Sequence, residues 1–525
     1  MTRKRSLWLV ACSLWTAAAL AQGVGPYAIS VERMRADIAF LSSKPLEGRK
    51  SLERGSEVAV QFVAAEFAKA GLRPAIGDSY IQEVPVLEYR VKPEGRRLAV
   101  RADGRARRLE YGKDFTGSFS QNVKVSGAVV FAGFGITAPE FGYDDYAGLD
   151  AHGKIVFMFD HEPQETDPRS VFHGLGNTIH ASPQAKILNA QRHGAVAVLT
   201  VAEPNRKHPS SLERMARVPG GRQRATSPSS QALAESERRI PSFSVSDAIA
   251  ADLLAVTGKK PGELQAAIDA TLKPASQALP AVSAEMQIEI AESRRAATAN
   301  VVGVLEGSDP NLREETVVFG AHYDHLGVRG GQVLPGADDD ASGTAAVIEL
   351  ARVFASATER PRRTLVFVAF GAEEAGLFGS YYYAMRPARP LEKARAVFSL
   401  DMIGRDEKPS AQTKGLIEIA EDTSNEVNFI GLKSSPALRP LLENANREIG
   451  LRLNYKWDDD AALSIMWRSD HYPFLLKGVP AVWVFNGFTP DYHQAADTID
   501  KLNFPKMEKI VRLVYLAGRA VAQAE

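Results

Sequence analysis

Six residues in the C-terminal half of the chain have side chains of the kinds that bind divalent metal ions. They follow short apolar runs and comprise two histidines, two aspartates and an adjacent glutamate pair: His322, Asp339, Glu373, Glu374, Asp401 and His493. Imidazole nitrogens and carboxylate oxygens suit hard or borderline divalent ions. The set is large enough for two ions, with one further carboxylate left to activate a water. The inventory therefore predicts a hydrolase with a two-metal site.

The first of these residues is expected at the end of a buried strand, residues 317–321. Open α/β sheets bind ligands at the carboxyl ends of their strands, so His322 is well placed to bind a metal. Asp324 lies two residues on, and its carboxylate could hold the second imidazole N–H of His322. A His-x-Asp sequence on its own is more often a polar turn, so this pair depends on the other groups for support.

Three consecutive acids, residues 338–340, open a predicted helix. The helix dipole stabilises one or two acids at this position, but a bound cation explains all three. The adjacent pair Glu373 and Glu374 could divide its work, one binding a metal and the other taking a proton from water. A solvated helix start is the ordinary alternative for this pair.

The remaining candidates follow two further apolar runs. Asp401 is either a helix cap or a ligand. Tyr492, beside His493, offers a phenolic O–H to an oxyanion that develops during a reaction. Each feature has an ordinary structural explanation alone. Together they supply ligands, a base and an oxyanion donor, all near the ends of predicted strands.

The elements that must position these residues alternate between strands and helices from residue 298 onward. Short apolar runs are predicted as strands at 317–321, 365–370, 396–400 and 482–485, and helices are predicted at 344–354 and 437–449. This alternation is typical of an α/β sheet with helices on both faces. We assign residues 29–122 and 283–525 to the N-terminal and catalytic parts of one domain. Its first elements are helices near 31–41 and 57–70.

Residues 123–282 differ from the flanking segments in their sequence pattern and predict a separate β-rich module. Its expected strands are 128–131, 154–159 and 195–199, and its expected helix is 184–193. Residues 203–239 are rich in Pro, Ser and Arg without periodicity, which predicts a surface loop.

Composition limits the function classes. The chain has 525 residues, which predicts two or three domains. Lys+Arg and Asp+Glu both total 63, so the basic footprint of a nucleic-acid binder is missing from the sequence.

The N-terminal residues predict a signal peptide, residues 1–21, and export to the periplasm or the medium. A basic start, an apolar run and a small-x-small sequence ending at Ala21 carry this interpretation. One alternative is an uncleaved anchor, for which the apolar run is short. The other is lipid attachment at Cys12, which is less favoured because the apolar run before Cys12 is very short and continues beyond it. Cys12 is the only cysteine, so after cleavage any metal would bind nitrogen and oxygen ligands. No later run is apolar enough to span a membrane.

The motifs resemble the di-zinc aminopeptidases, a family that includes bacterial leucyl aminopeptidase, aminopeptidase Y and glutamate carboxypeptidase. The similar segments are 46–49, 322–324, 336–343, 366–376, 397–404, 469–474 and 491–498. Residues 134–139 and 143–146 resemble a protease-associated domain, which we assign to the module at 123–282. The fold implied is a mixed, mostly parallel sheet between helices, the zinc exopeptidase fold, with this β-rich insert.

The resemblance also implies roles for individual residues. It implies two Zn²⁺ per chain, one on His322 and Asp401 and the other on Glu374 and His493, with Asp339 as the bridging ligand. It also implies that Glu373 is the general base. Asp324 would be the partner of His322, and Tyr492 would be the oxyanion donor. It further implies a cis peptide bond after Asp339.

The favoured function is therefore a secreted zinc exopeptidase, an aminopeptidase acting on peptide substrates. A zinc carboxypeptidase or dipeptidase, a glutaminyl cyclase and a non-catalytic receptor-like relative stay open as alternatives. A substrate amine would need carboxylates and a substrate carboxylate would need arginines; the candidates are Asp458, Asp459, Asp460 and Asp470 against Arg405 and Arg468. Four aromatics could line an apolar pocket or simply belong to the core: Trp457, Trp467, Phe485 and Phe488. The sequence does not indicate an oligomeric state.

Overall fold

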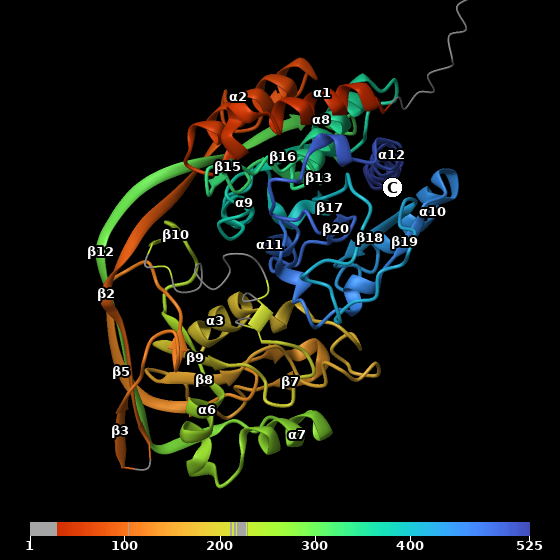
Figure 1. Cartoon of the computed structure of the whole chain (residues 1–525). Coiled ribbons are helices and arrows are strands. Elements are labelled where there is room, and N and C mark those ends of the chain that lie inside the picture. Colours follow the sequence, from red (N-terminus) through yellow and green to blue (C-terminus); the bar gives the residue numbers. More distant parts are fainter. Residues whose placement is uncertain (1–28, 103, 211–212, 215–216, 218–226, 228) are drawn as a thin grey trace, which may run out of the picture.

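We describe the protein from a computed structural model, in which residues 29–102, 104–210, 213–214, 217, 227 and 229–525 are described. The predicted signal peptide, 1–21, and part of the predicted loop at 203–239 lie outside these residues. Figure 1 shows two bodies, which two long strands join along one side. The catalytic body contains both the N-terminal helices and the C-terminus.

The centre of the catalytic body is a sheet with the strand order β19-β18-β20-β17-β13-β16-β12. The strands are β13 (Thr316–His322), β16 (Thr364–Phe370), β17 (Ala394–Leu400), β20 (Ala481–Phe485), β18 (Glu426–Ile430), β19 (Arg452–Asn454) and β12 (Gln277–Leu305). The four central strands, β16, β13, β17 and β20, are parallel, and β12 and β18 flank them antiparallel. All four predicted strands are confirmed.

Helices cover both faces of this sheet. The helices are α1 (Val31–Leu41), α2 (Arg54–Lys69), α8 (Ala341–Ser356), α9 (Phe378–Met385), α10 (Leu438–Ile449), α11 (Tyr472–Leu475) and α12 (Phe504–Gln523). The largest apolar cluster joins one face of the sheet to α1, α2, α8 and α12, and a second cluster packs side chains of α9 and α11 on the other face. The predicted fold class, a mixed and mostly parallel sheet between helices, is confirmed.

The start of helix α8 positions the three consecutive acids. The Asp340 side chain caps the helix by accepting the Gly343 N–H at 2.9 Å. Gly343 lies so close to β17 that a Cβ there would come within 2.1 Å of the Leu400 carbonyl oxygen. The absence of a side chain at Gly343 therefore allows the start of α8 to pack directly against the end of β17.

The second body is a smaller parallel arrangement that contains the predicted β-rich module. Its strands are β5 (Val123–Phe131), β8 (Ile155–Phe159), β9 (Ala197–Val201), β11 (Ser242–Val245) and β4 (Phe115–Thr116), and its helices include α3 (Pro183–Arg192), α6 (Asp247–Leu254) and α7 (Pro261–Thr271). Pairs β5–β8, β8–β9 and β9–β11 are parallel. Its apolar core also takes side chains from 89–119 and from 284–290, so the packing extends beyond the predicted 123–282. Those bounds stay a prediction.

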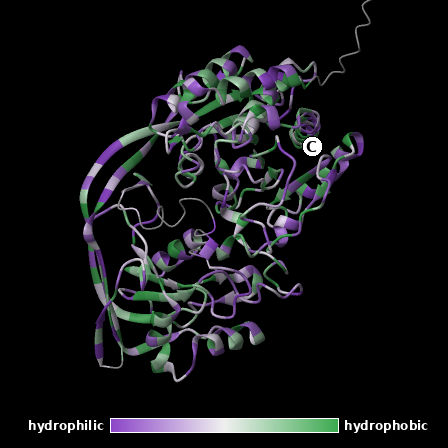
Figure 2. Ribbon diagram, viewed as in Figure 1, coloured by the Kyte–Doolittle hydropathy of each residue, from purple (hydrophilic) through white to green (hydrophobic). Residues whose placement is uncertain are grey.

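Two long strands, β2 (Ile81–Ala102) and β12, link the bodies. They pair antiparallel from Ile81–Val301 to Arg101–Ser283 and run through both cores. Figure 2 shows them apolar where they enter each body and mixed in the stretch between. Residues Ser229–Leu233, within the predicted loop, form β10 and pair with β2.

A fully buried arginine ties the N-terminal segment to the turns that carry the site. The Arg49 guanidinium donates to four carbonyl oxygens: Tyr323 at 2.7 Å, Leu41 at 2.6 Å, Pro335 at 2.6 Å and Gly336 at 2.9 Å. Tyr323 follows the end of β13, and Gly336 precedes the three acids. Burial lowers the pKa of Arg49 to about 10, although nearby aspartates oppose the shift.

We expect Arg49→Met to lower the free energy of unfolding by at least about 3 kcal/mol, because it leaves several buried carbonyl groups without donors. Chemical denaturation would measure the loss. The control is Arg90→Met, which removes an exposed ion pair with Glu292 and should cost no more than about 1 kcal/mol. Equal stability of the two variants would contradict the role assigned to Arg49.

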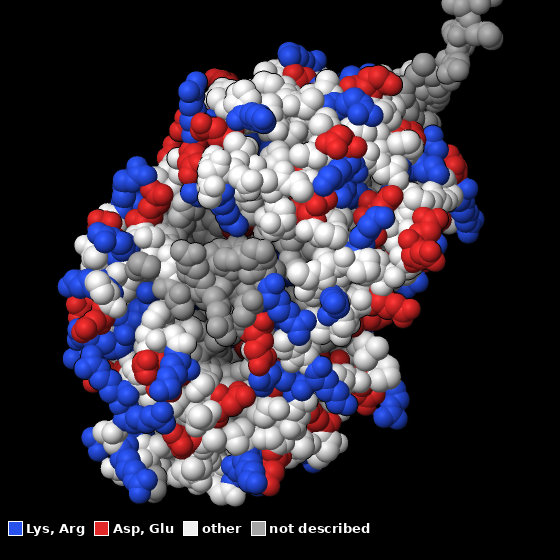
Figure 3. Space-filling model, in the orientation of Figure 1, with Lys and Arg blue, Asp and Glu red and all other residues white. Residues whose placement is uncertain are grey.

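The surface carries both charges. On the face drawn in Figure 3, Lys and Arg are interspersed with Asp and Glu over both bodies. Among the described residues, no helix has the length and apolar character needed to cross a membrane.

Candidate metal centre and active site

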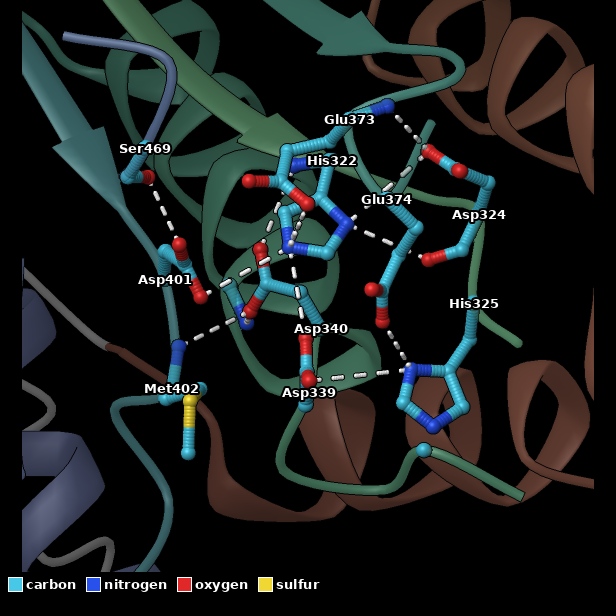
Figure 4. A network of polar contacts seen from close by, with 12 residues as sticks. His322, Asp324, His325, Asp339, Asp340, Glu373, Glu374, Asp401, Met402 and Ser469 are labelled. Atoms are coloured by element: carbon cyan, nitrogen blue, oxygen red, sulfur yellow. Dashed lines mark hydrogen bonds and ion pairs between the residues drawn. The ribbon is translucent and has the colours of Figure 1, made fainter. Parts of the chain in front are cut away.

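The predicted site residues meet at one edge of the central sheet. His322 ends β13, Glu373 and Glu374 follow β16, and Asp401 follows β17. These strands are parallel, so their carboxyl ends lie side by side, as Figure 4 shows for the side chains of these residues. The turn before α8 supplies Asp339, and the segment after β20 supplies His493.

One group of ligand atoms gathers around the His322 ring. Its Nε2 atom lies 3.4 Å from Asp339 Oδ1 and 3.6 Å from Asp401 Oδ1. The other oxygen of Asp401 accepts the Ser469 hydroxyl at 2.6 Å, which fixes the carboxylate with Oδ1 towards His322. This is the first pair that the resemblance implied, His322 with Asp401.

A second group gathers around His493. Its Nε2 atom lies 3.1 Å from Asp339 Oδ2 and 3.3 Å from Glu374 Oε1. The two oxygens of Asp339 therefore face different histidines, as expected of a carboxylate that bridges two ions. The Asp339–Asp340 peptide bond is cis, which confirms that prediction.

The other two acids of the run bind backbone rather than the candidate metal site. Asp340 lies beside His322 and Asp401. Its oxygens, however, accept the N–H groups of Gly343 at 2.9 Å, Met402 at 3.1 Å and His322 at 3.2 Å. Asp338 accepts the Gly404 N–H at 2.7 Å. Asp339 is therefore the acid of the run whose oxygens face the histidines, and the hydrogen bonds of its neighbours join β13, α8 and β17.

His325 is a residue of the site that the sequence analysis missed. It is fully buried, and its Nδ1 atom lies 2.9 Å from Glu374 Oε1 and 3.7 Å from Asp339 Oδ2. Its ring meets the His493 ring edge to face, with centroids 5.8 Å apart. The available signal was a second histidine three residues after His322, in the same turn.

Asp324 acts on the site differently from the prediction. The Nδ1 atom of His322 lies 3.1 Å from the backbone oxygen of Asp324 and 3.9 Å from its carboxylate. The carbonyl therefore holds the imidazole N–H. The carboxylate accepts the Glu373 N–H at 3.0 Å and the Ser51 hydroxyl at 3.0 Å, so that it positions Glu373 instead. Burial raises the pKa of Asp324 to about 6.

The adjacent glutamates differ sharply in their acidity. Burial raises the pKa of Glu373 well above its usual value, although His322, 3.8 Å from its carboxylate, opposes the shift. Burial also acts to raise the pKa of Glu374, but His493 and His325 together outweigh it and lower the pKa to about 2. Neighbouring carboxyl groups with opposite shifts suit different tasks. Glu374 is suited to remain an ionised ligand, and Glu373 to exchange a proton.

Tyr492 stacks on His493, with ring centroids 3.7 Å apart. Its phenol oxygen lies 3.5 Å from Arg468 Nη2, which donates to it and leaves the phenolic hydrogen available for a substrate oxygen. Burial raises the pKa of Tyr492 well above its usual value, although Arg468 opposes the shift. The phenol therefore stays protonated and can donate.

The residues predicted to bind a substrate terminus differ in their contacts within the protein. Asp458 and Asp460 cap backbone N–H groups, and Asp459 pairs with Lys433. Asp470 is fully buried, with neither oxygen hydrogen-bonded within the described chain. Arg405 pairs with Asp491 at 2.8 Å. Three of the four aromatics, Trp457, Phe485 and Phe488, are core residues beside the site, and Trp467 is partly buried.

Backbone conformation at the site is unusual. Three non-glycine residues that border it, Ala372, Met402 and His493, have φ values of 58°, 57° and 61°. This left-handed region costs side-chain-bearing residues energy, and such residues cluster where function requires them.

The residues present fit divalent ions. His325 Nδ1 and Glu374 Oε1 lie 2.9 Å apart without hydrogen-bond geometry, and within the described part of the chain neither these atoms nor His325 Nε2 has a hydrogen-bond partner. Buried lone pairs that face one another are unfavourable unless a proton or a cation lies between them. The donor set combines imidazole nitrogen with carboxylate oxygen, which suits zinc.

Residues 300–517 match the sequence profile of Peptidase family M28. This part of the chain belongs to peptidase family M28. The matched range contains every predicted ligand, from His322 to His493, as well as Glu373 and Tyr492. The family assignment that the motifs predicted is confirmed.

Curated relatives of the M28 domain include aminopeptidase YwaD of Bacillus subtilis, 27% identical over 42% of this chain and 43% of the relative. A probable zinc metalloprotease of Leptosphaeria maculans is 29% identical over 45% of this chain and 54% of the relative. The chain thus spans about half the length of such relatives. Among solved structures, an aminopeptidase from Aneurinibacillus sp. strain AM-1 aligns over 94% of each chain, with 23% identity and a TM-score of 0.49.

Proposed function

We propose that the protein is a zinc-dependent aminopeptidase that uses two metal ions. The observation that carries this is Asp339, whose two carboxylate oxygens face different histidines. His322 and Asp401 would hold one ion, and Glu374 and His493 the other. Zinc and the aminopeptidase activity are supported by the M28 match and by the names of the relatives.

When bound there, zinc supplies a polarised water of lowered pKa and stabilises negative charge on the substrate oxygen. The chain's own residues do the rest. Glu373 would accept a proton from the water and later donate it to the leaving amine, and the Asp324 carboxylate holds the Glu373 backbone in place. Tyr492 would donate its phenolic hydrogen to the oxyanion.

The groups that could bind a substrate terminus favour recognition of a free amine, and therefore an exopeptidase that acts at the N-terminus. Asp470, which is fully buried, and Glu373, whose side chain is 12% exposed, place carboxyl groups at the site. Arg405 is committed to Asp491, whereas Arg468 contacts Tyr492 and Gln412. The site therefore offers two carboxyl groups to a substrate terminus, against Arg468 alone among the two candidate arginines. The sequence of residues 1–21 supports export as a part of this proposal.

The test is a substrate panel read with and without a chelator. Aminoacyl reporters should be hydrolysed, carboxy-terminal dipeptide reporters should not, and chelation should abolish turnover until zinc is restored. Cleavage from the C-terminus would instead establish a carboxypeptidase, and cyclisation of N-terminal glutamine would establish a glutaminyl cyclase. No turnover on the whole panel by zinc-loaded protein would contradict an enzymatic role.

A further inference from the structure

A second group of metal-type residues lies in the module, outside the M28 match. It consists of His161, Glu165, Glu203 and His208, and we call it the module cluster. Each residue offers a ligand atom, and all four atoms lie within 4.8 Å of one another. The four side chains are nearly buried, with exposures of 3–6%.

Parallel strands position the cluster. His161 and Glu165 follow β8, and Glu203 and His208 follow β9, its parallel neighbour. The four residues therefore gather at the carboxyl ends of adjacent strands, as the catalytic residues do in the other body.

The distances converge on a shared centre. His208 Nε2 lies 2.7 Å from Glu165 Oε2 and 2.9 Å from Glu203 Oε1. His161 Nδ1 contacts Glu165 Oε1 and lies 3.7 Å from Glu203 Oε1. Glu203 Oε1 is buried, and its contacts with the two rings lack hydrogen-bond geometry within the described chain. Two buried carboxylates that face two imidazoles require positive charge between them.

Hydrogen bonds to surrounding residues orient the side chains of the module cluster. His208 Nδ1 lies 3.1 Å from the Pro209 carbonyl, which can only accept, so this nitrogen is held as a donor. His161 Nε2 lies 3.2 Å from the Ser464 hydroxyl, and Asn177 donates to Glu165 Oε1 at 2.8 Å. The other nitrogen of each ring is thereby directed inward. Zinc-binding histidines are held by such outer hydrogen bonds.

Protonation of His208, whose Nε2 atom lies 2.7 Å and 2.9 Å from the two carboxylates, is the alternative source of one positive charge, and the ring geometry disfavours a second charge on His161. The two rings stack with centroids 4.7 Å apart and an interplanar angle of 22°. Two imidazolium cations in this arrangement would repel each other in a buried site. A single divalent ion balances both carboxylates and leaves the rings neutral.

We infer that the module cluster is a zinc site, with two histidine nitrogens and two glutamate oxygens as a tetrahedral ligand set. It would also join the two bodies. Ser464, the partner of His161, belongs to the segment that carries Trp467 and Ser469, and the Trp467 ring meets the His161 ring edge to face at 5.8 Å. Ser469 in turn holds the catalytic ligand Asp401.

The experiment measures zinc content in the full chain after loading and exhaustive dialysis. We expect His208→Asn and the near-isosteric Glu203→Gln each to lose one zinc per chain relative to wild type. The matched control is His180→Asn, because His180 lies in the same module but contacts one carboxylate, Glu140, at 2.6 Å. It should lose none. Unchanged zinc content in both cluster variants would overturn the inference.

An Asp339→Ala background separates the module cluster from the catalytic site. This protein should keep one zinc, and Co²⁺ loading should give it the absorption bands of a tetrahedral N/O site. Zinc should raise its melting temperature, and adding His208→Asn should remove both effects. An Asp339→Ala protein that binds no metal would overturn the zinc site without bearing on the catalytic proposal. An adventitious surface ion would survive the added His208→Asn change.

Discussion

Glu373→Gln should reduce kcat by about 10²–10⁴-fold while zinc content stays at the wild-type level, because removal of a general base has effects of this size. The amide keeps the shape of the side chain but can no longer accept the proton of the water. Since Glu373 is not one of the assigned ligands, metal binding should persist. Steady-state kinetics on an aminoacyl reporter, with metal analysis of the same sample, provide the measurement.

Two further variants serve as comparisons for Glu373→Gln. Glu374→Gln, one residue further, should lower zinc content as well as turnover, because Glu374 is the assigned ligand beside His493. Glu392→Gln changes an exposed glutamate and should leave both quantities unaltered. Near wild-type turnover in metal-loaded Glu373→Gln protein would show that another group is the base.

Asp339→Ala should abolish measurable turnover and remove zinc from the catalytic site. Its two oxygens face His322 at 3.4 Å and His493 at 3.1 Å, so the substitution removes a ligand from both positions at once. A change at Asp401 or His493 would take a ligand from one position only. Metal analysis after dialysis and reporter kinetics measure the two losses.

Asp459→Ala is the control for this second variant. Asp459 belongs to the acidic run 458–460, is about half exposed and pairs with Lys433, so its loss should leave turnover and zinc unchanged. An Asp339→Ala protein that keeps the full catalytic zinc complement would disprove the bridging role.

Much of the catalytic body could be predicted because its strands are short, continuous and fully buried. Runs such as Val317–Ala321 and Val482–Phe485 are apolar on both sides, as parallel strands covered by helices must be. Polar residues at the ends of such runs stand out, which is why the sequence indicated His322 and Asp401. The two-histidine arrangement around Asp339 required the family resemblance, since it depends on segments over 150 residues apart.

The features that could not be predicted depend on tertiary geometry. His325 looked like an ordinary turn residue, because nothing in the local sequence shows that Glu374 lies beside it. The Asp324 carboxylate turned towards Glu373 because the carbonyl of the same residue already satisfies His322. The module cluster was missed because its histidines lie 47 positions apart, one of them within a segment predicted as a loop.

The long pairing of β2 with β12, which shifts register only around Ile290, has a consequence for protein engineering. Each strand contributes one end to each apolar core, and the two ends belong to the same ladder of hydrogen bonds. Excising the smaller body would truncate the ladder and leave unpaired strand edges, which invite aggregation. The two bodies therefore cannot be removed or exchanged independently. Shortening this protein to a minimal peptidase would require redesign of the β2–β12 strand pair that they share.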